Sequence, residues 1–460
     1  MALIKSISGI RGTIGGSVGD NLTAIDIVEC TMAYGHFINT INKEKKSKVI
    51  VGRDGRITGK QLSALVCNTL QMMGIDVIDL GLSTTPTVEI AVPIEDAAGG
   101  IILTASHNPR EWNALKFLNH KGEFISAAEG RQILDYIDDK TLTYADVDDQ
   151  GSYSTSDVYI DKHIQMILDL DYLDIDLIKA HQFSVVVDCI NSTGAISIPP
   201  LLEKLNVTFV LINEEMTGEF AHNPEPLPKN MTQLSEAVLK EKADFGICVD
   251  PDVDRLAFMS EDGVAFGEEY TLVAIADFIL SKKKGNTVSN LSSTRALADV
   301  TKSHGGSYAA SAVGEVNVVD LMKSTQAVIG GEGNGGVILP ELHYGRDAIV
   351  GIALMLNLLA ERKLSMSQLR KSYPQYHIVK NKIQLTPLID INHILKIVEH
   401  RFKSEKLNTV DGLKIDFEDG WVHLRKSNTE PIIRVYAEST SPEQANSKIK
   451  LVMDAIKDDI

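Results

Sequence analysis

Cysteine is scarce in this sequence and follows no pairing pattern. Four cysteines occur among 460 residues, scattered in apolar surroundings and without a CxxC arrangement. This distribution argues against a disulfide framework or a zinc site built on cysteine. It favours buried, reduced thiols in a cytoplasmic protein.

Long hydrophobic runs and excess positive charge are also missing. Residues 1–16 lack the apolar core of a signal peptide. The most apolar helical candidate, residues 348–360, is too short to span a bilayer. The 45 Lys and Arg are outnumbered by 62 Asp and Glu, giving a net charge of −17, which argues against binding of nucleic acid or an anionic membrane. An anionic substrate would therefore require a local cluster of Arg and Lys.

Three segments share the order apolar strand, polar loop, helix and second strand: residues 48–80, 183–212 and 286–312. Such a β-α-β unit places its two strands parallel in one sheet, with the helix over one face. A chance similarity among α/β units is the alternative to a true internal repeat. The pattern predicts an α/β protein with three related domains.

The expected domain boundaries follow from composition and from strand order. The polar, acidic stretch 138–157 is typical of a linker, and a chain of this length exceeds a single hydrophobic core. After residue 373, strands and helices are separable, which predicts a smaller α+β domain. The expected domains are residues 1–150, 151–257, 258–373 and 374–460.

A polar loop follows one of the predicted buried strands. The apolar run 101–103 precedes Thr104, Ser106, His107 and Asn108, and then Pro109. Open α/β sheets bind ligands at such strand ends. A helix N-cap is the alternative, because Ser or Asn often precedes a helix that begins with proline.

An acidic string, DPDVDR at residues 250–255, follows another apolar strand. In an extended segment alternate side chains point the same way, so Asp250, Asp252 and Asp254 can converge on one cation. Carboxylate oxygens favour Mg²⁺ or Ca²⁺ over zinc. An EF-hand is disfavoured because Arg255 stands where that loop needs glycine. A solvated acidic turn is the other alternative.

Two further strings lie toward the carboxyl terminus. GEGNGG at residues 331–336 matches GxGxxG by letter, but an apolar run and a proline follow it instead of a helix, which excludes a dinucleotide-binding fingerprint. RKSNTEP at residues 425–431 lies between two strand-like runs. Its arginine, hydroxyls and backbone amides suit a phosphate cradle, with a basic hairpin turn as the alternative.

In chain order, these strings resemble the motifs of the α-D-phosphohexomutase family. TASHNP resembles the family's phosphoserine loop, DPDVDR its Mg²⁺ loop, GEGNGG its sugar-recognition loop and SNTEP its phosphate-binding loop. GIRG at residues 9–12 and GRDGR at residues 52–56 are weaker matches; in the second, Asp54 is implied to fix an arginine. Glu315 and Gly336 depart from the family, since relatives carry His there. The resemblance covers almost the whole chain and implies three α/β domains and a C-terminal lid around a central cleft.

The resemblance also implies a role for each site residue. Ser106 would carry the phosphoryl group and bind Mg²⁺ together with Asp250, Asp252 and Asp254. Lys116, His107 and Arg11 would be catalytic, and Lys116 would act as general acid and base with a pKa lowered by burial near Arg255 and the metal. The implied substrate contacts are Arg255, Glu332, Asn334, Arg425, Ser427, Asn428, Thr429 and Arg434. For Arg434, a position on the strand face without a substrate contact is the alternative.

The implied reaction interconverts the 6-phosphate and 1-phosphate of a hexose through a hexose 1,6-bisphosphate, with Mg²⁺ as cofactor. The implied partner is a phosphosugar, and the expected assembly is a monomer or homodimer. The resemblance favours phosphoglucosamine mutase over phosphomannomutase or phosphoglucomutase. A metal-dependent sugar phosphatase and a non-catalytic sugar-phosphate sensor are the remaining alternatives. A sensor would need neither Ser106 nor the complete aspartate triplet.

Overall fold

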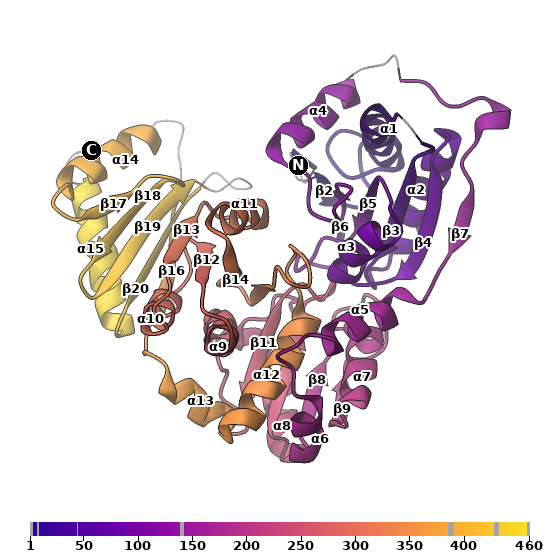
Figure 1. Ribbon diagram of the computed structural model, residues 1–460. Coiled ribbons are helices and arrows are strands. Elements are labelled where there is room, and N and C mark those ends of the chain that lie inside the picture. Colours follow the sequence, from indigo (N-terminus) through magenta and orange to yellow (C-terminus); the bar gives the residue numbers. More distant parts are fainter. Residues whose placement is uncertain are drawn as a thin grey trace. The chain divides into compact units, whose positions relative to one another are not determined.

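The computed structural model describes residues 3–6, 9–43, 45–138, 142–384, 391–426 and 432–457 (Figure 1). The chain divides into two compact units. The first comprises Met1–Thr271 and Gly335–Ser367, and the second Leu272–Asn334 and Gln368–Ile460. No helix of the described ranges is both long and apolar enough to cross a membrane.

The first unit begins with a seven-stranded mixed sheet in the order β1-β2-β6-β5-β3-β4-β7. Its strands are β1 (Ile4–Ser6), β2 (Gly9–Thr13), β3 (Lys48–Arg53), β4 (Asp76–Leu82), β5 (Gly99–Leu103), β6 (Trp112–Leu118) and β7 (Tyr153–Thr155). The accompanying helices are α1 (Ala24–Ile41), α2 (Gly59–Met72), α3 (Thr85–Ile94) and α4 (Ala127–Asp138), and the 3₁₀ turn η1 (Val147–Asp149) precedes β7. Parallel pairing of β3 with β4 across α2 confirms the first predicted β-α-β unit. The stretch interpreted as a linker contains β7, which pairs with β4.

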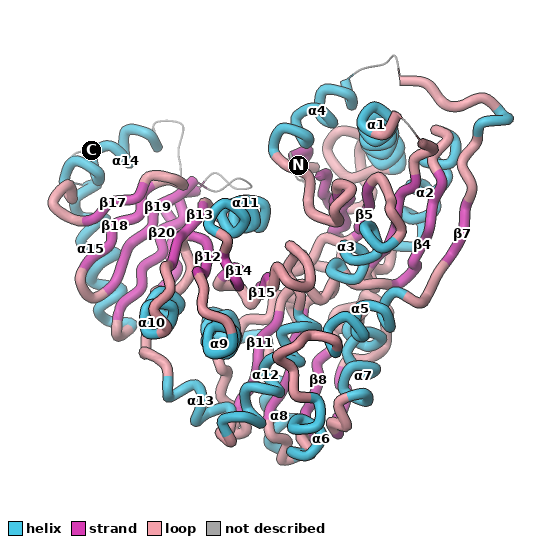
Figure 2. The backbone as a smooth tube through the Cα atoms, viewed as in Figure 1, coloured by secondary structure: helices cyan, strands magenta, loops and turns pink. Residues whose placement is uncertain are grey.

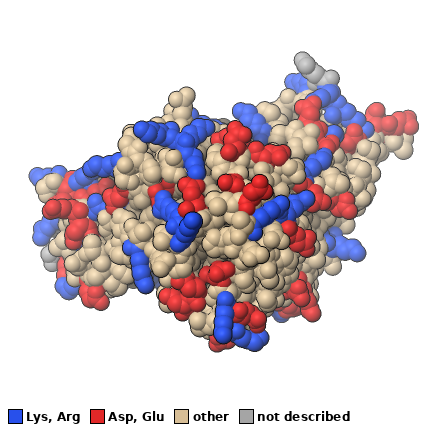
Figure 3. Space-filling model, turned by 60° about the horizontal axis from the view of Figure 1, so that its bottom comes forward, with Lys and Arg blue, Asp and Glu red and all other residues tan. Residues whose placement is uncertain are grey.

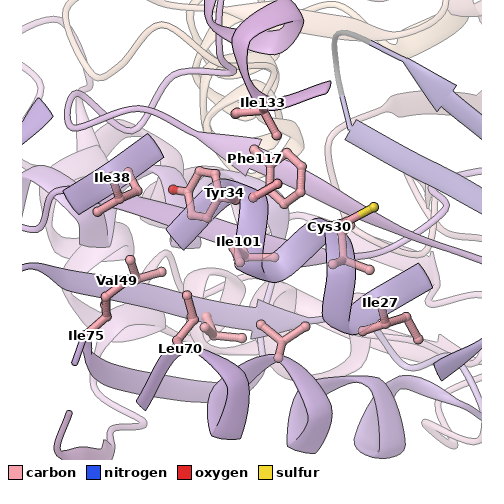
Figure 4. Close-up of a cluster of buried hydrophobic side chains, with 14 of the residues drawn as sticks. Ile27, Cys30, Tyr34, Ile38, Val49, Leu70, Ile75, Ile101, Phe117 and Ile133 are labelled. Atoms are coloured by element: carbon pink, nitrogen blue, oxygen red, sulfur yellow. The ribbon is translucent and has the colours of Figure 1, made fainter. Parts of the chain in front are cut away.

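Alternate residues of the central strands enter two different cores. Val49, Val51 and Ile101 pack with α1, α2 and α4 on one face (Figure 4). Ile50 and Ile102 pack with α3 on the other. Since side chains alternate across a strand, both faces of this sheet are buried, and β5 is buried at every position. The loop after β5 therefore begins at a strand whose position is fixed by packing on both faces.

The first unit contains a second, four-stranded sheet in the order β11-β10-β8-β9. Its strands are β8 (Ser184–Asp188), β9 (Thr208–Ile212), β10 (Phe245–Val249) and β11 (Leu256–Ser260). The remaining elements are α5 (Tyr159–Leu168), α6 (Ile175–His181), α7 (Gly194–Lys204), the 3₁₀ turn η2 (Pro228–Asn230), α8 (Thr232–Glu241), β15 (Gly336–Ile338) and α12 (Ala348–Arg362). Parallel pairing of β8 with β9 across α7 confirms the second predicted unit. β10 and β11 pair antiparallel, and the turn between them carries the DPDVDR string.

The second unit contains β12 (Asn286–Asn290), β13 (Tyr308–Ser311) and β14 (Ala327–Glu332), with α10 (Ala296–Ser303) and α11 (Glu315–Thr325). β12 pairs in parallel with both β13 and β14, which confirms the third predicted unit. The unit boundaries lie within α9 (Glu268–Lys282), between β14 and β15 at residues 334–335, and within α13 (Met366–Ser372). Figure 2 shows the alternation of helices and strands along the chain.

The second unit ends in an antiparallel sheet in the order β16-β20-β19-β18-β17. Its elements are β16 (His377–Gln384), α14 (Ile391–Arg401), β17 (Lys406–Asn408), β18 (Leu413–Phe417), β19 (Gly420–Lys426), β20 (Ile432–Ser439) and α15 (Pro442–Lys457). α14 and α15 contribute to one apolar core with this sheet. The predicted combination of three α/β units and a smaller α+β domain is confirmed.

Charge is mixed on the face of the molecule drawn in Figure 3. There, Lys and Arg side chains lie among Asp and Glu side chains and do not gather into one large basic patch.

Tyr34 connects α1 to the first sheet. Its buried hydroxyl lies 2.7 Å from the carbonyl oxygen of Leu118 and 3.1 Å from that of Gly100. Its ring stacks on Phe117 with a centroid separation of 4.6 Å (Figure 4). We expect Tyr34→Phe to lower the free energy of unfolding of the first unit by about 1–2 kcal/mol, because a buried hydrogen bond is lost while the ring remains.

Urea denaturation followed by Trp112 fluorescence, in a Trp421→Phe background, measures this effect. The matched control is Tyr136→Phe, since the Tyr136 hydroxyl pairs with Gln132 at the surface. The control should leave the midpoint unchanged. An unchanged midpoint in Tyr34→Phe as well would contradict the proposed contribution of the hydroxyl.

Candidate active site

Ser106 occupies a constrained position directly after β5. Its backbone has a φ of 48°, its amide donates to Thr104 Oγ1 at 2.9 Å, and its side chain is largely buried. The hydroxyl donates to Asp250 Oδ2 at 2.6 Å and lies 3.2 Å from His107 Nδ1. The element after Pro109 is β6, so the alternative of a helix N-cap is wrong.

Arg56 holds the backbone of this loop in place. Its buried guanidinium pairs with Asp54 at 3.1 Å, which confirms that Asp54 fixes an arginine. The same guanidinium donates at 2.6–2.8 Å to four carbonyl oxygens, those of Ser106, Asn108, Pro109 and Trp112. Sequence reasoning missed this function of Arg56. Every residue has a backbone carbonyl oxygen, so the sequence does not indicate which carbonyls the arginine contacts.

The aspartate triplet converges as predicted, although not for the predicted reason. All three carboxylates are fully buried, and one oxygen of each lies within 4.8 Å of the others. The segment is a tight turn, in which the Val253 amide donates to the Asp250 carbonyl at 3.0 Å and Val253 has a φ of 61°. The extended geometry expected from the alternation of Asp is therefore wrong. Burial also excludes the solvated acidic turn.

Hydroxyls and cations from several elements surround the triplet. Asp252 Oδ2 accepts from Lys116 Nζ at 2.9 Å and from the Thr85 hydroxyl at 2.7 Å. Asp254 Oδ2 accepts from Arg346 Nη2 at 2.6 Å. Asp252 Oδ1 and Asp254 Oδ1 are buried and accept no hydrogen bond within the described ranges. Such carboxylate oxygens fit a hard divalent cation.

Burial and close charges set the protonation states. Burial, together with the charges of Asp254 and Asp252, raises the pKa of Asp250 well above its usual range. Burial alone would raise the pKa of Asp252, but Lys116 and Thr85 hold it below its usual range.

Lys116 differs from its prediction. Burial alone would lower the pKa of its ammonium, but the carboxylates of Asp252 and Asp254 raise it above the usual value. The expected lowering of this pKa is therefore wrong, and Lys116 is a cation held against the triplet. By contrast, burial and the charge of Arg255 hold the pKa of His107 well below its usual range, so a neutral imidazole faces Ser106.

A cavity of about 120 Å³ opens beside these residues. Its walls bring together all four predicted catalytic side chains, namely Arg11, Ser106, His107 and Lys116, and two further cations, Arg255 and Arg346. Arg346 was not identified from the sequence, because a single arginine before an apolar helix matches no motif. In a protein with a net charge of −17, this is the local cationic cluster that a phosphate ligand requires.

The second unit holds Glu332 at the end of β14. Its buried carboxylate accepts from Asn290 Nδ2 at 2.9 Å, from the Gly314 amide at 3.2 Å and from Asn334 Nδ2 at 3.4 Å. The strand β15 begins at the last residue of the GEGNGG string, which agrees with the exclusion of a dinucleotide fingerprint. Glu332 and Asn334 thus lie together, as the resemblance predicts.

Arg425 and Arg434 lie opposite each other on β19 and β20. Arg425 is 3.7 Å from Asp411, which accepts from the Val313 amide at 3.0 Å. Because Gly314 contacts Glu332, the turn at residues 313–314 connects Glu332 to Arg425 within this unit. Ser427, Asn428 and Thr429 lie outside the described residues.

Comparison with known proteins matches the entire domain series. Models described as phosphoglucomutase/phosphomannomutase domains I, II and III match residues 3–143, 157–263 and 267–376, and the model of the C-terminal domain matches residues 381–455.

Individual relatives match over nearly their full length. A Methanopyrus kandleri protein named "Probable phosphoglucosamine mutase" is 32% identical over 98% of this chain and 97% of its own length. A Thermococcus kodakarensis "Phosphoglucomutase/phosphomannomutase" is 32% identical over 97% and 99%. The crystal structure of a phosphoglucomutase/phosphomannomutase family protein from Burkholderia thailandensis superposes with a TM-score of 0.86 and 25% identity, covering 99% of this chain and 97% of its own.

Three findings support the same family assignment: four domain models match in order, relatives are more than 30% identical over the whole length, and a solved structure has the same fold. The chain belongs to the phosphoglucomutase/phosphomannomutase family of α-D-phosphohexomutases, isomerases that transfer a phosphoryl group within a hexose phosphate.

Proposed function

We propose that this phosphohexomutase acts through a phosphorylated Ser106 and a hexose 1,6-bisphosphate, and that glucosamine phosphate is its preferred substrate. The observation that carries the proposal is the 2.6 Å hydrogen bond from the Ser106 hydroxyl to Asp250. It supports Ser106 as the nucleophile, beside a buried triplet in which Asp252 Oδ1 and Asp254 Oδ1 accept no hydrogen bond from the described residues. Phosphoryl transfer depends mainly on positioning and charge neutralisation, and this arrangement supports both.

Asp250, Asp252, Asp254 and the Ser106 oxygen are the residues that would hold Mg²⁺. A hard cation is supported here by Asp252 Oδ1 and Asp254 Oδ1, which are buried and accept no hydrogen bond in the part of the chain that the structure describes. When bound, Mg²⁺ would neutralise charge that develops on the transferred phosphoryl group.

Proton transfer is assigned to Lys116, with His107 beside the nucleophile. The Lys116 ammonium lies in the same cavity as Ser106, so it can donate a proton to a sugar oxygen and take it back in the reverse direction. The neutral His107 offers Nδ1 at 3.2 Å from the Ser106 oxygen, which suits it to orient the hydroxyl.

Arg11 and Arg255 line the cavity and would bind the phosphate that reacts with Ser106. In the second unit, Glu332 and Asn334 would bind sugar hydroxyls. Arg425, with Arg434, Ser427, Asn428 and Thr429, would bind the phosphate that does not react. A guanidinium suits that function because its planar fork matches phosphate oxygens.

The preference for glucosamine phosphate is supported by the name of the Methanopyrus relative, whereas the Thermococcus relative carries a glucose and mannose name at the same 32% identity. We expect kcat/KM for glucosamine 6-phosphate to exceed the values for glucose 6-phosphate and mannose 6-phosphate by roughly 10-fold or more, the effect of one well-placed polar contact. Parallel assays of the three sugars measure this. A higher value for glucose or mannose 6-phosphate would contradict the glucosamine preference and leave the mutase assignment intact.

Ser106→Ala should lower kcat by about 10⁴-fold or more, because the phosphoryl carrier is lost. Incubation with ³²P-labelled glucose 1,6-bisphosphate should label the unmodified protein and not the variant. Ser154→Ala, which removes a hydroxyl from β7 of the same sheet, is the matched control and should be labelled normally. Label on Ser106→Ala would assign the phosphoryl carrier to another residue.

Asp252→Asn should raise the Mg²⁺ concentration for half-maximal activity roughly 10-fold or more, since one anionic ligand is neutralised. Treatment with EDTA should abolish the activity of the unmodified enzyme, and Mg²⁺ should restore it. Asp262→Asn is the control: this exposed carboxylate accepts from the Val264 amide in the turn after β11. Full activity after EDTA treatment would show that the triplet is structural.

A further inference from the structure

A second group of buried ionisable side chains lies in the first unit, apart from the aspartate triplet. It consists of Glu89 from α3, His163 from α5, and His343 and Asp347 from the segment before α12. Glu89, His163 and Asp347 are at most 1% exposed, and the His343 side chain is 10% exposed. The reaction proposed above uses none of these four residues.

Both imidazoles direct Nε2 at a single carboxylate oxygen. His163 Nε2 lies 2.8 Å from Asp347 Oδ2, and His343 Nε2 lies 3.3 Å from the same atom. One ligand atom of each of the three residues lies within 4.8 Å of the others. Asp347 Oδ1 accepts from two amides at the start of α12, which fixes the carboxylate so that Oδ2 faces the rings.

The opposite nitrogen of each ring also lies near a polar group. His163 Nδ1 lies 3.0 Å from the Thr87 hydroxyl, and His343 Nδ1 lies 3.3 Å from Glu89 Oε2. Histidines that ligate a metal through Nε2 usually have Nδ1 fixed in this way by a carboxylate or another polar group. The Thr87 hydrogen bond therefore presets the orientation of the His163 ring, whereas the contact between His343 Nδ1 and Glu89 lacks hydrogen-bond geometry.

We propose that His163 Nε2, His343 Nε2 and Asp347 Oδ2 form a Zn²⁺ site. Tetrahedral Zn²⁺ with bonds near 2.0–2.1 Å separates its ligand atoms by about 3.3 Å. The His343–Asp347 pair already has this separation, and the His163–Asp347 pair must open by about 0.5 Å. Imidazole nitrogen selects Zn²⁺ over Mg²⁺, so this site and the aspartate triplet prefer different metals.

The charges of the cluster suit a divalent cation. With both rings neutral, Asp347 and Glu89 contribute two negative charges at a buried position. A divalent cation bound there would neutralise both charges at once.

The Zn²⁺ site shares two supports with the Ser106 site. α3 carries Thr87 and Glu89, and it also carries Thr85, whose hydroxyl contacts Asp252. Arg346, which contacts Asp254, directly precedes Asp347. Bound Zn²⁺ would thus stabilise the segments that present Thr85 and Arg346 to the triplet. The Zn²⁺ site does not depend on the proposed substrate or on the phosphorylation of Ser106.

The test uses the full chain, stripped of metal and then dialysed against Zn²⁺ in the presence of saturating Mg²⁺, followed by elemental analysis. We expect one retained Zn²⁺ per chain in the unmodified protein and in Asp252→Asn. His163→Gln should lose it, and Thr87→Val should weaken Zn²⁺ binding by about 10- to 100-fold. The matched control is His222→Gln: His222 Nε2 also lies 2.8 Å from a carboxylate, that of Asp188, but no second imidazole belongs to that pair, so Zn²⁺ should be retained.

Substitution with Co²⁺ gives a second measurement that does not depend on any variant folding. Co²⁺ in the unmodified protein should show the strong visible absorption of a tetrahedral site, and added Zn²⁺ should abolish it. Two results would overturn the proposal. One is the absence of retained Zn²⁺ and of this absorption in the unmodified protein. The other is Zn²⁺ that is lost in Asp252→Asn and kept in a folded His163→Gln, which would place the metal at the triplet.

Discussion

The structure of the first unit depends on the burial of three carboxylates within 4.8 Å of one another. Like charges at this distance in a protein interior repel strongly, and an uncompensated buried charge costs several kcal/mol. Compensation comes from separate elements: Lys116 from β6, Arg346 from before α12, and the hydroxyls of Thr85 and Ser106. These elements must meet for the turn at residues 250–255 to be buried at all. The need to compensate the buried carboxylates therefore determines both the arrangement of the site and the packing of these elements in the fold.

Strand and motif positions could be predicted from the sequence because they depend on local signals. The apolar run at residues 101–103 predicted the buried strand β5, and the polar residues after it predicted the Ser106 loop. Both predictions were possible because the hydrophobicity of successive residues indicates which of them are buried. The three β-α-β units followed from the same signals. Glu332 and Asn334 were expected in one loop and share a hydrogen bond. These features need no knowledge of how distant segments pack.

What the sequence could not predict depends on backbone conformation and on distant partners. The triplet converges because Val253 adopts a positive φ, whereas β-branched residues rarely do so and the alternating Asp suggested an extended strand. The pKa of Lys116 is raised because two carboxylates lie at its ammonium, a proximity that only the tertiary structure creates. The cluster of Glu89, His163, His343 and Asp347 comes from three distant parts of the chain. No spacing rule for metal ligands spans such separations.

The rigidity of the Ser106 loop decides which partner must move during the proposed reaction. Arg56 bonds four carbonyl oxygens around this loop, and the Ser106 hydroxyl is held at 2.6 Å from Asp250. A nucleophile fixed in this way is preorganised for phosphoryl transfer. It cannot follow a phosphate from one end of a sugar to the other. In the proposed reaction the bisphosphate would therefore have to turn between the two transfers, so the contacts proposed for the sugar and its distal phosphate would have to accept both orientations. Arginine and carboxylate side chains suit this requirement, because they recognise phosphate and hydroxyl groups at either end of the hexose by the same hydrogen bonds.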